Sequence, residues 1–200
     1  MADVNASCTD DGITPLYCAV QNKDTESAKI SLRHKADPNA TGTNDDPLLY
    51  IAAKKGSVVR TELLPENDAD VKVTRHEGST PSDIAAYKGH TEVVRLLLLD
   101  HKAGVNVVHT RFQRTPLYAA TEERHTEIVK LLLDEKADMN ARAGNDGDTL
   151  LYNAAVGGQV EIVKLLLENK ADVNKQNTDG DTPLKCARLC KLRDIIKPLE

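Results

Sequence analysis

A short string of residues recurs six times along the chain, and this repetition limits the fold more than any other feature. The string first begins at Thr14 and returns, with changes, at Pro47, Thr80, Thr115, Thr149 and Thr182. The steps between these starts are 33, 33, 35, 34 and 33 residues. A period of this length is typical of repeat architectures, in which each unit is one supersecondary element. We therefore expect a stack of similar units along nearly the whole chain.

Two further strings follow in the same order within each unit. The second is apolar and reads AKISL, VRTEL, VRLLLL, VKLLLD and VKLLLE in successive units. The third closes the unit and reads ADPNA, ADVK, AGVN, ADMNA and ADVNK. A unit of this size cannot bury its apolar face alone, so we expect its stability to come from stacking on its neighbours.

With these three strings the chain resembles the ankyrin-repeat family, whose signature T-P-L-H-x-A recurs at a similar period. The resemblance covers about residues 3–197 and implies an all-α fold, a solenoid of helix-turn-helix units joined by β-turn or hairpin loops. It implies about five full repeats and a shortened C-terminal capping repeat. The expected single domain, residues 1–200, divides at approximately 7–40, 41–72, 73–106, 107–140, 141–174 and 175–200.

The local sequence agrees with two helices per unit. A Thr at the head of a unit can accept a hydrogen bond from a backbone N–H group and so cap a helix, and Pro is favoured at the next position. In the fourth unit these rules predict helices over about 116–123 and 126–135. Pro65 should end the second helix of unit two early, and Pro198 should end the last helix. Together with the extra Leu in unit three, Pro65 marks units two and three as the less stable part of the stack.

Composition excludes several classes of protein. Aromatic residues are only 3% of the chain, which weighs against a β-sandwich. The net charge of −5 lacks the basic excess typical of nucleic-acid binders. The sequence contains neither a signal peptide pattern nor an apolar run long enough to span a membrane. The four cysteines, Cys8, Cys18, Cys186 and Cys190, favour reduced thiols in the cytoplasm or nucleus.

The family resemblance also implies which residues face a partner protein. In ankyrin repeats the variable positions lie in the turn before each Thr-Pro and near the end of the first helix, and they line one concave face. Four tyrosines at the His position of the signature are instead interpreted as scaffold. The candidate partner-binding residues are Lys54, Lys55, His76, Glu77, Tyr87, Lys88, Arg111, Phe112, Arg114, Glu122, Glu123, Asn145, Asp146 and Asp148.

These candidates are unevenly charged along the sequence. The central units contribute lysines and arginines, whereas acidic turn residues are found toward both ends. Phe112 is predicted at a turn tip between Arg111 and Arg114, where an apolar ring gains little from folding, although packing on a neighbouring turn is the alternative. Aromatic and Arg side chains are favoured anchors of interfaces. We therefore expect an acidic strand or helix end of a partner protein to suit the basic centre.

No sequence motif predicts catalysis or a resident cofactor. The chain lacks a phosphate-binding loop, a dinucleotide fingerprint and a nucleophile elbow, and its His and Cys residues lack zinc-ligand spacing. We therefore expect no catalytic residues, no cofactor and no metal site. The family resemblance adds one modification: Asn140 and Asn174, each with a Leu eight residues earlier, are candidates for asparaginyl hydroxylation. The alternative is that these side chains only satisfy turn backbone groups.

The resulting expectation is a non-enzymatic scaffold, monomeric alone, that binds another protein through its concave face. Alternatives are a module of a larger regulatory or channel protein, a host-directed microbial effector, and an enzyme with an unrecognised site. A nucleic-acid binder is a further alternative, and it predicts binding that weakens steeply with salt. Fold-level analogy does not choose among these settings.

Overall fold

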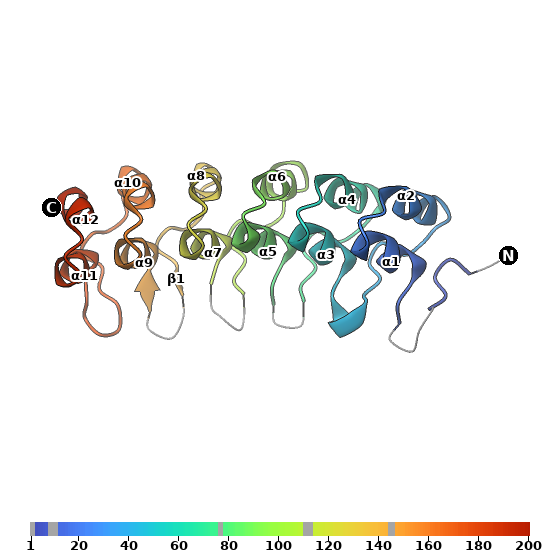
Figure 1. The fold of residues 1–200 in the computed structure, drawn as a ribbon, viewed down its shortest axis with the longest axis horizontal. Coiled ribbons are helices and arrows are strands. Elements are labelled where there is room, and N and C mark those ends of the chain that lie inside the picture. Colours follow the sequence, from blue (N-terminus) through green and yellow to red (C-terminus); the bar gives the residue numbers. More distant parts are fainter. Residues whose placement is uncertain (1–2, 8–11, 76–77, 110–113, 144–146) are drawn as a thin grey trace. The chain divides into compact units, whose positions relative to one another are not determined.

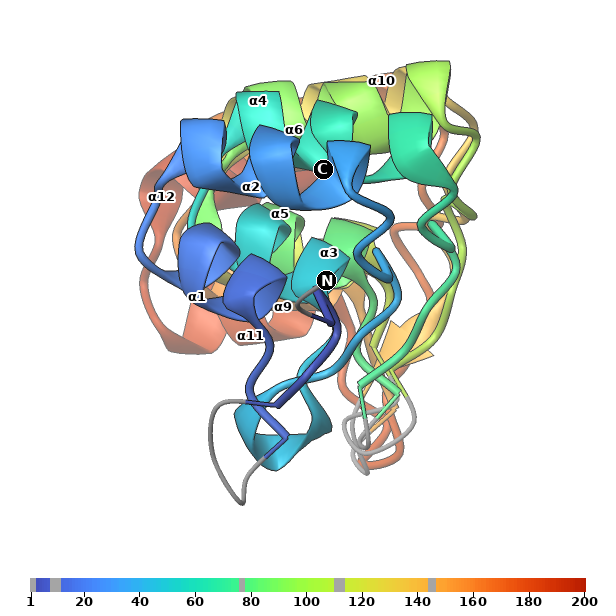
Figure 2. The same ribbon diagram turned by 90° about the vertical axis from the view of Figure 1, so that its right-hand side faces the viewer.

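The computed structural model describes residues 3–7, 12–75, 78–109, 114–143 and 147–200, and these form two compact units, residues 1–104 and 105–200. Both units consist of paired helices, which confirms the all-α ankyrin-repeat fold. Within each unit the first helices of the repeats lie in one layer and the second helices in another, with loops projecting beyond the first-helix layer (Figures 1 and 2).

Unit 1 contains three helix pairs. Its first helices are α1 (Pro15–Gln21), α3 (Leu48–Lys54) and α5 (Pro81–Lys88), and its second helices are α2 (Thr25–Arg33), α4 (Val58–Leu63) and α6 (Thr91–Arg95). Two short 3-10 turns, η1 (Thr43–Asp45) and η2 (Pro65–Asn67), and a π-helical turn, η3 (Leu96–Asp100), complete it.

Unit 2 repeats the arrangement. Its first helices are α7 (Pro116–Glu122), α9 (Leu150–Val156) and α11 (Pro183–Leu189), and its second helices are α8 (Thr126–Asp134), α10 (Val160–Glu168) and α12 (Arg193–Leu199). Two-residue strands β1 (Arg142–Ala143) and β2 (Asp148–Thr149) pair antiparallel at the base of one loop. The helices expected at 116–123 and 126–135 are confirmed to within one residue.

The first helices begin where the Thr residues predict. Thr14, Thr80, Thr115, Thr149 and Thr182 each accept a hydrogen bond from the backbone N–H three residues later, at 3.1–3.3 Å. This contact satisfies one of the donors that a helix N-terminus leaves unpaired. In the second repeat, which belongs to unit 1, Pro47 occupies the cap position, and α3 begins without a side-chain cap.

The core of both units is made of Leu, Ile, Val and Ala side chains. Alanine pairs such as Ala52-Ala53 and Ala119-Ala120 are fully buried, which lets first helices pack closely against their neighbours. Second helices bury residues at positions 3, 6 and 7, for example Ile128, Leu131 and Leu132. This spacing of apolar residues is the amphipathic pattern expected of a helix with one exposed face.

Proline acts differently at its two unusual positions. The expectation that Pro65 ends the second helix of the second repeat early is confirmed, because α4 ends at Leu63 and the chain continues as the 3-10 turn η2. Pro198 corrects the expectation for the last helix, because it lies inside α12, which ends at Leu199. In this final turn the missing N–H group of Pro198 costs only one helical hydrogen bond.

Asparagine side chains join consecutive repeats within each unit. Asn39 accepts from the Asp70 N–H at 2.8 Å and donates to the Asp68 carbonyl at 3.2 Å. In unit 2, Asn106 accepts from the Asp138 N–H at 2.8 Å. Such bonds satisfy the turn backbone that the closing motif leaves between helices.

Candidate functional site

The candidate binding residues fall in both units, so each unit is described by itself. Lys54, Lys55, Tyr87 and Lys88 belong to unit 1, and Arg114, Glu122, Glu123 and Asp148 belong to unit 2. The remaining candidates lie outside the described residues: His76, Glu77, Arg111, Phe112, Asn145 and Asp146. We call the ends of the first helices and the loops before them the first-helix face of a unit.

A groove of ≈ 370 Å³ lies on the first-helix face of unit 1. Three of its lining residues are lysines at the C-terminal ends of two neighbouring first helices: Lys54 ends α3, Lys55 is its C-cap, and Lys88 ends α5. The other lining residues are Tyr17, Gln21, Asn44, Asp46 and Ile51. Helices α3 and α5 pack directly against each other, and this packing brings the three lysines together.

Two of the lining residues, Lys54 and Asp46, contact groups beside the groove: an aromatic ring and an arginine. Tyr50 is only 4% exposed, and Arg75 and the Lys54 ammonium lie 5.8 and 6.0 Å from its ring centroid. The guanidinium of Arg75 forms an ion pair with Asp46. Burial raises the pKa of Tyr50. The carboxylate of Asp46 is therefore already neutralised by Arg75.

The groove lysines themselves have no carboxylate partner among the described residues. Lys54 and Lys88 are exposed, and Lys55 is half-buried. The Lys88 ammonium lies 5.1 Å from the ring centroid of Tyr87, the residue before it in α5. Neither this contact nor that of Lys54 with Tyr50 supplies a negative charge. Three like charges thus line one groove without an ion pair to offset them.

His90 ties the two lysine-bearing helices together. Its Nε2 lies 3.2 Å from the backbone carbonyl of Lys54, across the repeat boundary. Gly56 makes room for this ring, because an added Cβ there would lie 2.7 Å from two of its atoms. This contact gives His90 a structural role between the second and third repeats.

The first-helix face of unit 2 has a different electrostatic character, because it contains ion pairs between its own charged groups. Arg114 binds Glu122 at 2.9 Å, so two of the candidate binding residues neutralise each other. Asn153 donates to the hydroxyl of Tyr118 at 3.1 Å, which fixes the tyrosine between α7 and α9. Burial raises the pKa of Tyr118.

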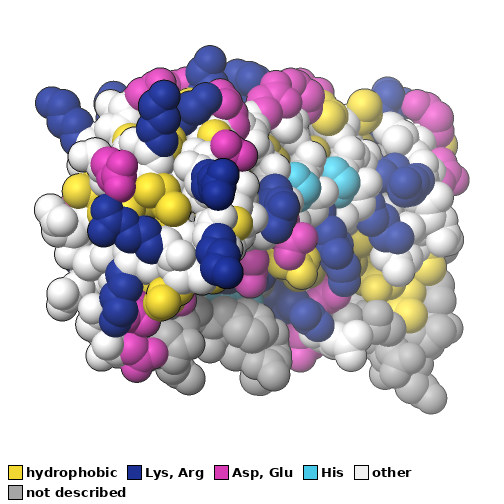
Figure 3. Space-filling model, turned by 60° about the vertical axis from the view of Figure 1, so that its left-hand side comes forward, with side chains coloured by type: hydrophobic (Ala, Val, Ile, Leu, Met, Phe, Trp, Pro, Cys, Tyr) yellow, Lys and Arg dark blue, Asp and Glu magenta, His cyan; other side chains and the backbone are white. Residues whose placement is uncertain are grey.

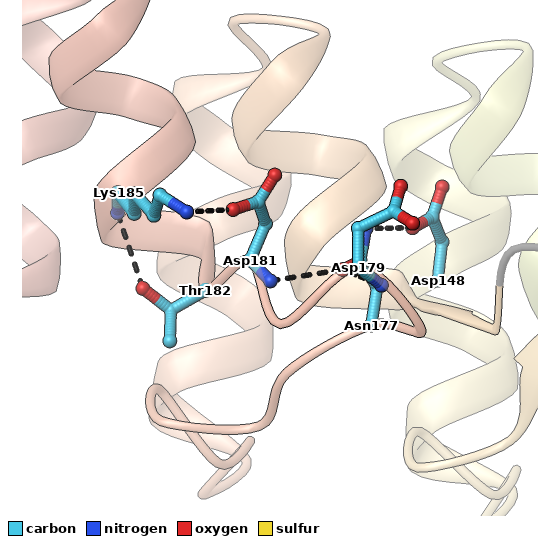
Figure 4. A network of polar contacts seen from close by, with 6 residues as sticks. All are labelled: Asp148, Asn177, Asp179, Asp181, Thr182 and Lys185. Carbon is cyan, nitrogen blue, oxygen red and sulfur yellow. Dashed lines mark hydrogen bonds and ion pairs between the residues drawn. The ribbon is translucent and has the colours of Figure 1, made fainter.

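Asp148 takes part in a polar network that organises the last loop of unit 2 (Figure 4). The side chain of Asn177 donates to Asp148 at 3.0 Å, and its oxygen accepts from the N–H groups of Asp179 and Asp181. Lys185 forms an ion pair with Asp181. This arrangement gives Asn177 and Asp148 a structural role in holding the loop against the preceding repeat.

Charges of both signs are distributed over the surface. On the face shown in Figure 3, Lys and Arg side chains are interspersed with Asp and Glu side chains. The described part of the chain contains no group of three or more His, Cys, Asp or Glu side chains placed to hold a metal ion. Among the same residues, no helix is long and apolar enough to cross a bilayer.

The cysteines and one tyrosine of unit 2 lie close together. Cys186 and Cys190 are free thiols, as is Cys18 in unit 1. Burial, followed by a hydrogen bond with the Cys186 thiol, raises the pKa of Tyr152 to about 12. Burial also raises the pKa of Cys186. A thiol with a raised pKa carries less of the reactive thiolate at neutral pH, so this pair is not an activated nucleophile.

Comparison with protein-family models decides the assignment of the fold. A single ankyrin repeat matches residues 11–43, and arrays of three ankyrin repeats match residues 49–143 and 140–199. The chain belongs to the ankyrin-repeat family. Ankyrin repeats form protein-interaction modules, and the family is generally non-enzymatic.

Individual relatives share the repeats over part of this ankyrin-repeat chain. It is 34% identical over 90 residues to the human transient receptor potential cation channel subfamily A member 1, covering 44% of this chain and 8% of the channel. Alpha-latrocrustotoxin-Lt1a of Latrodectus tredecimguttatus is 32% identical over 97 residues, 48% of this chain and 7% of the toxin. A putative ankyrin repeat protein of Rickettsia bellii is 32% identical over 109 residues, with 52% and 39% covered. The chain thus spans well under half the length of these relatives.

The wall of the ankyrin-repeat groove includes residues that sequence reasoning did not select. Gln21 and Asp46 line the groove, and Arg75 pairs with Asp46, but none of the three was among the candidate partner-binding residues. Tyr50 was assigned to the scaffold, and its burial confirms this, yet the same ring also contacts two cations. The recurrent Tyr in the His position was the available signal for such a ring, but no pattern indicated which cations would reach it.

Proposed function

We propose that this ankyrin-repeat chain is a non-enzymatic scaffold that binds a partner protein through its concave face, the surface formed by the first helices and their loops. The observation that carries the proposal is the groove of unit 1, where Lys54, Lys55 and Lys88 meet without a carboxylate partner among the described residues. Unpaired charges of one sign on a rigid surface favour association with a complementary surface. Family membership supplies the general function, protein interaction.

We propose that residues 1–200 act as one repeat array and that the first helices of both units contribute to the binding surface. Repeat stacks are stabilised by contacts between neighbours, and they display side chains from successive repeats at a regular spacing. We propose that the chain is monomeric alone, that it acts in the cytoplasm or nucleus, and that it needs no cofactor. The partner is a protein in each setting considered, whether the chain is a module of a larger channel or regulatory protein or a host-directed effector.

Nucleic-acid binding is the weaker proposal. It would use Lys54, Lys55 and Lys88 as phosphate contacts, but the chain as a whole is acidic, with a net charge of −5. Such binding would fall steeply with salt concentration and would be unaffected by loss of Phe112. Protein binding instead predicts a shallower salt dependence and a strong dependence on aromatic anchors.

We also propose Asn140 and Asn174 as candidate sites of asparaginyl hydroxylation. Both asparagines are exposed in the turns that follow α8 and α10, which supports access to an enzyme. Leu132 and Leu166, eight residues earlier, are fully buried, so a modifying enzyme that contacts them needs local unfolding. Mass spectrometry of the native protein tests this: one added oxygen on Asn174 supports the proposal, and fully unmodified peptide contradicts it.

Affinity capture from cell lysate tests the scaffold function. We compare wild type with a Tyr87→Ala/Phe112→Ala variant and with a matched control, Ile30→Ala/Val59→Ala, which removes exposed apolar side chains from the second helices. Circular dichroism first establishes that all three proteins fold. We expect partners to be lost from the first variant and retained by the control. Identical partners on all three proteins would contradict binding through the concave face.

A further inference from the structure

The lining of the unit 1 groove is charged in a way that defines its ligand. Three ammonium groups line it, and Asp46, the one carboxylate among the described lining residues, is paired with Arg75. The groove is therefore locally basic although the chain carries a net charge of −5. A ligand that brings carboxylates would relieve repulsion among Lys54, Lys55 and Lys88 and would meet no unpaired acidic group in the groove lining.

From this arrangement we infer that the groove binds a short acidic segment of a partner protein, with Asp or Glu side chains contacting Lys54, Lys55 and Lys88. The inference rests on the proposed scaffold function and names the partner chemistry at one of its surfaces. The lysines lie at adjacent helix ends, so a single extended segment can reach all three. A Lys ammonium is a compact charge with three hydrogen-bond donors, so it can bind carboxylates in several orientations.

The groove is also held in shape before a ligand arrives. The Lys54 ammonium lies over the buried ring of Tyr50, and that of Lys88 lies over Tyr87. His90 bonds the carbonyl of Lys54 at 3.2 Å and fixes the end of α3 relative to the start of α6. Because these contacts reduce the conformational entropy that binding would cost, they favour a bound segment.

Polar groups beside the lysines suit the backbone of a peptide. Gln21 at the end of α1 and Asn44 in η1 are exposed and line the same groove. An amide side chain both donates and accepts, as a peptide backbone does, so these residues can bond an extended segment. Carboxylates on the lysines and backbone groups on the amides together describe a peptide better than a simple anion.

The size of the groove separates an acidic peptide from a nucleic acid. A volume of ≈ 370 Å³ accommodates a few side chains. Single-strand binding combines a basic track with exposed aromatic rings on which bases stack. Among the described residues, Tyr17 is the aromatic residue that lines the groove, and it is only 5% exposed, so its ring offers no stacking surface. The observations therefore favour the peptide.

Fluorescence anisotropy with a labelled peptide of alternating Asp and Glu tests this inference on the full chain. A Lys54→Ala/Lys55→Ala/Lys88→Ala variant is compared with Lys72→Ala/Lys130→Ala/Lys164→Ala, which removes the same charge from exposed positions outside the groove. We expect the groove variant to lose at least about tenfold in affinity, as the loss of three ion pairs at the protein surface implies, and the control less than about threefold. A peptide of alternating Asn and Gln should not bind wild type.

Three results would overturn the inference: no binding of the acidic peptide to wild type, equal losses in both variants, or tighter groove-dependent binding of oligothymidylate. These outcomes are separate from a failure of the scaffold function. Capture from lysate with the same two variants distinguishes the two failures. If partner proteins depend on the groove lysines but the acidic peptide does not bind, the scaffold function stands and only the acidic ligand is refuted. Circular dichroism of both variants excludes misfolding as the cause.

Discussion

The amide of Ala103 donates to the carbonyl of Leu97 at 2.8 Å, six residues earlier in the chain. The corresponding alanines, Ala36, Ala69, Ala137 and Ala171, reach only five residues back, at 2.9–3.0 Å. The third repeat therefore contains one extra residue inside the end of its second helix, and the π-helical turn η3 accommodates it. Leu96, Leu97 and Leu98 stay buried, whereas Leu99 is 39% exposed.

Deletion of Leu99 should convert η3 into a regular end of α6. We expect the free energy of unfolding to stay within about 1 kcal/mol of wild type, because Leu99 is the most exposed of the four leucines and a π-helical turn has no intrinsic advantage over an α-helical one. Urea denaturation measures this change.

Deletion of Leu133 in α8 is the matched control. This residue is 4% exposed within a regular helix, so its removal shifts the following residues out of register. We expect a loss of several kcal/mol, in the range of large core disruptions. Equal costs for the two deletions would contradict the account of η3 as an inserted residue.

Sequence reasoning located this insertion only to a repeat. The step of 35 residues and the run Leu96–Leu99 showed that the third repeat is longer, but a loop could have accommodated the extra residue equally well. The choice depends on packing, and in the π-helical turn Leu96, Leu97 and Leu98 are buried. The Thr caps, the helix ends of the fourth repeat and the effect of Pro65 were predictable because they depend on local backbone chemistry, whereas the effect of Pro198 was not.

Arg60 occupies a core position in α4. It is 3% exposed and stands at the third helical position, which Val93, Ile128 and Ile162 fill in other second helices. Among the described residues its Nε has no hydrogen-bond partner and no carboxylate pairs with it, and burial lowers its pKa. We expect Arg60→Ile to raise the free energy of unfolding by about 1–2 kcal/mol, because a buried charge without a partner is destabilising.

The reverse substitution supplies the control for Arg60. Ile128→Arg places the same side chain in the corresponding fully buried position of α8, and we expect it to cost at least about 3 kcal/mol. Chemical denaturation of both variants provides the comparison. If Arg60→Ile lowered stability, Arg60 would have a partner or role that the structure does not show. The low stability of the second and third repeats stays a prediction, and amide hydrogen exchange measures it.

Asn39 should contribute to stability through its two bonds to the next turn. In Asn39→Ala the Asp70 N–H and the Asp68 carbonyl lose their side-chain partner, and we expect a loss of about 1–2 kcal/mol by urea denaturation. Asn174 occupies the same place in its closing motif, and among the described residues its side chain makes no such bond. Asn174→Ala should therefore change stability by less than about 0.5 kcal/mol. Similar costs for both would refute the bridging role of Asn39.

Tyr152 should make stability sensitive to alkaline pH. Its pKa is raised to about 12 in the folded chain, against about 10 in an unfolded one. The unfolded chain therefore loses this proton first, so the contribution of Tyr152 is full below pH ~10 and is lost as pH rises toward ~12. We expect the stability difference between wild type and Tyr152→Phe to shrink over that interval. A difference that is constant with pH would show that the phenol is not perturbed.

The sequence predicted where the candidate binding residues lie in the repeats, but not which of their charges form ion pairs. The resemblance placed Lys54, Lys55 and Lys88 near helix ends, and the structure brings them to one groove. It gave no means to see that Arg114 binds Glu122 within unit 2, because ion pairs between a loop and a helix depend on side-chain reach. The same is true of Arg75 and Asp46, whose pairing leaves the lysines as the unneutralised charges.

Site-specific photo-crosslinking tests the central claim most directly. A benzophenone amino acid replaces Lys54 on the first-helix face or, as control, the exposed Lys130 on α8, and each protein is irradiated in cell lysate. We predict a discrete adduct with a partner protein from position 54 and none from position 130. Adducts from position 130 alone would contradict binding through the first-helix face.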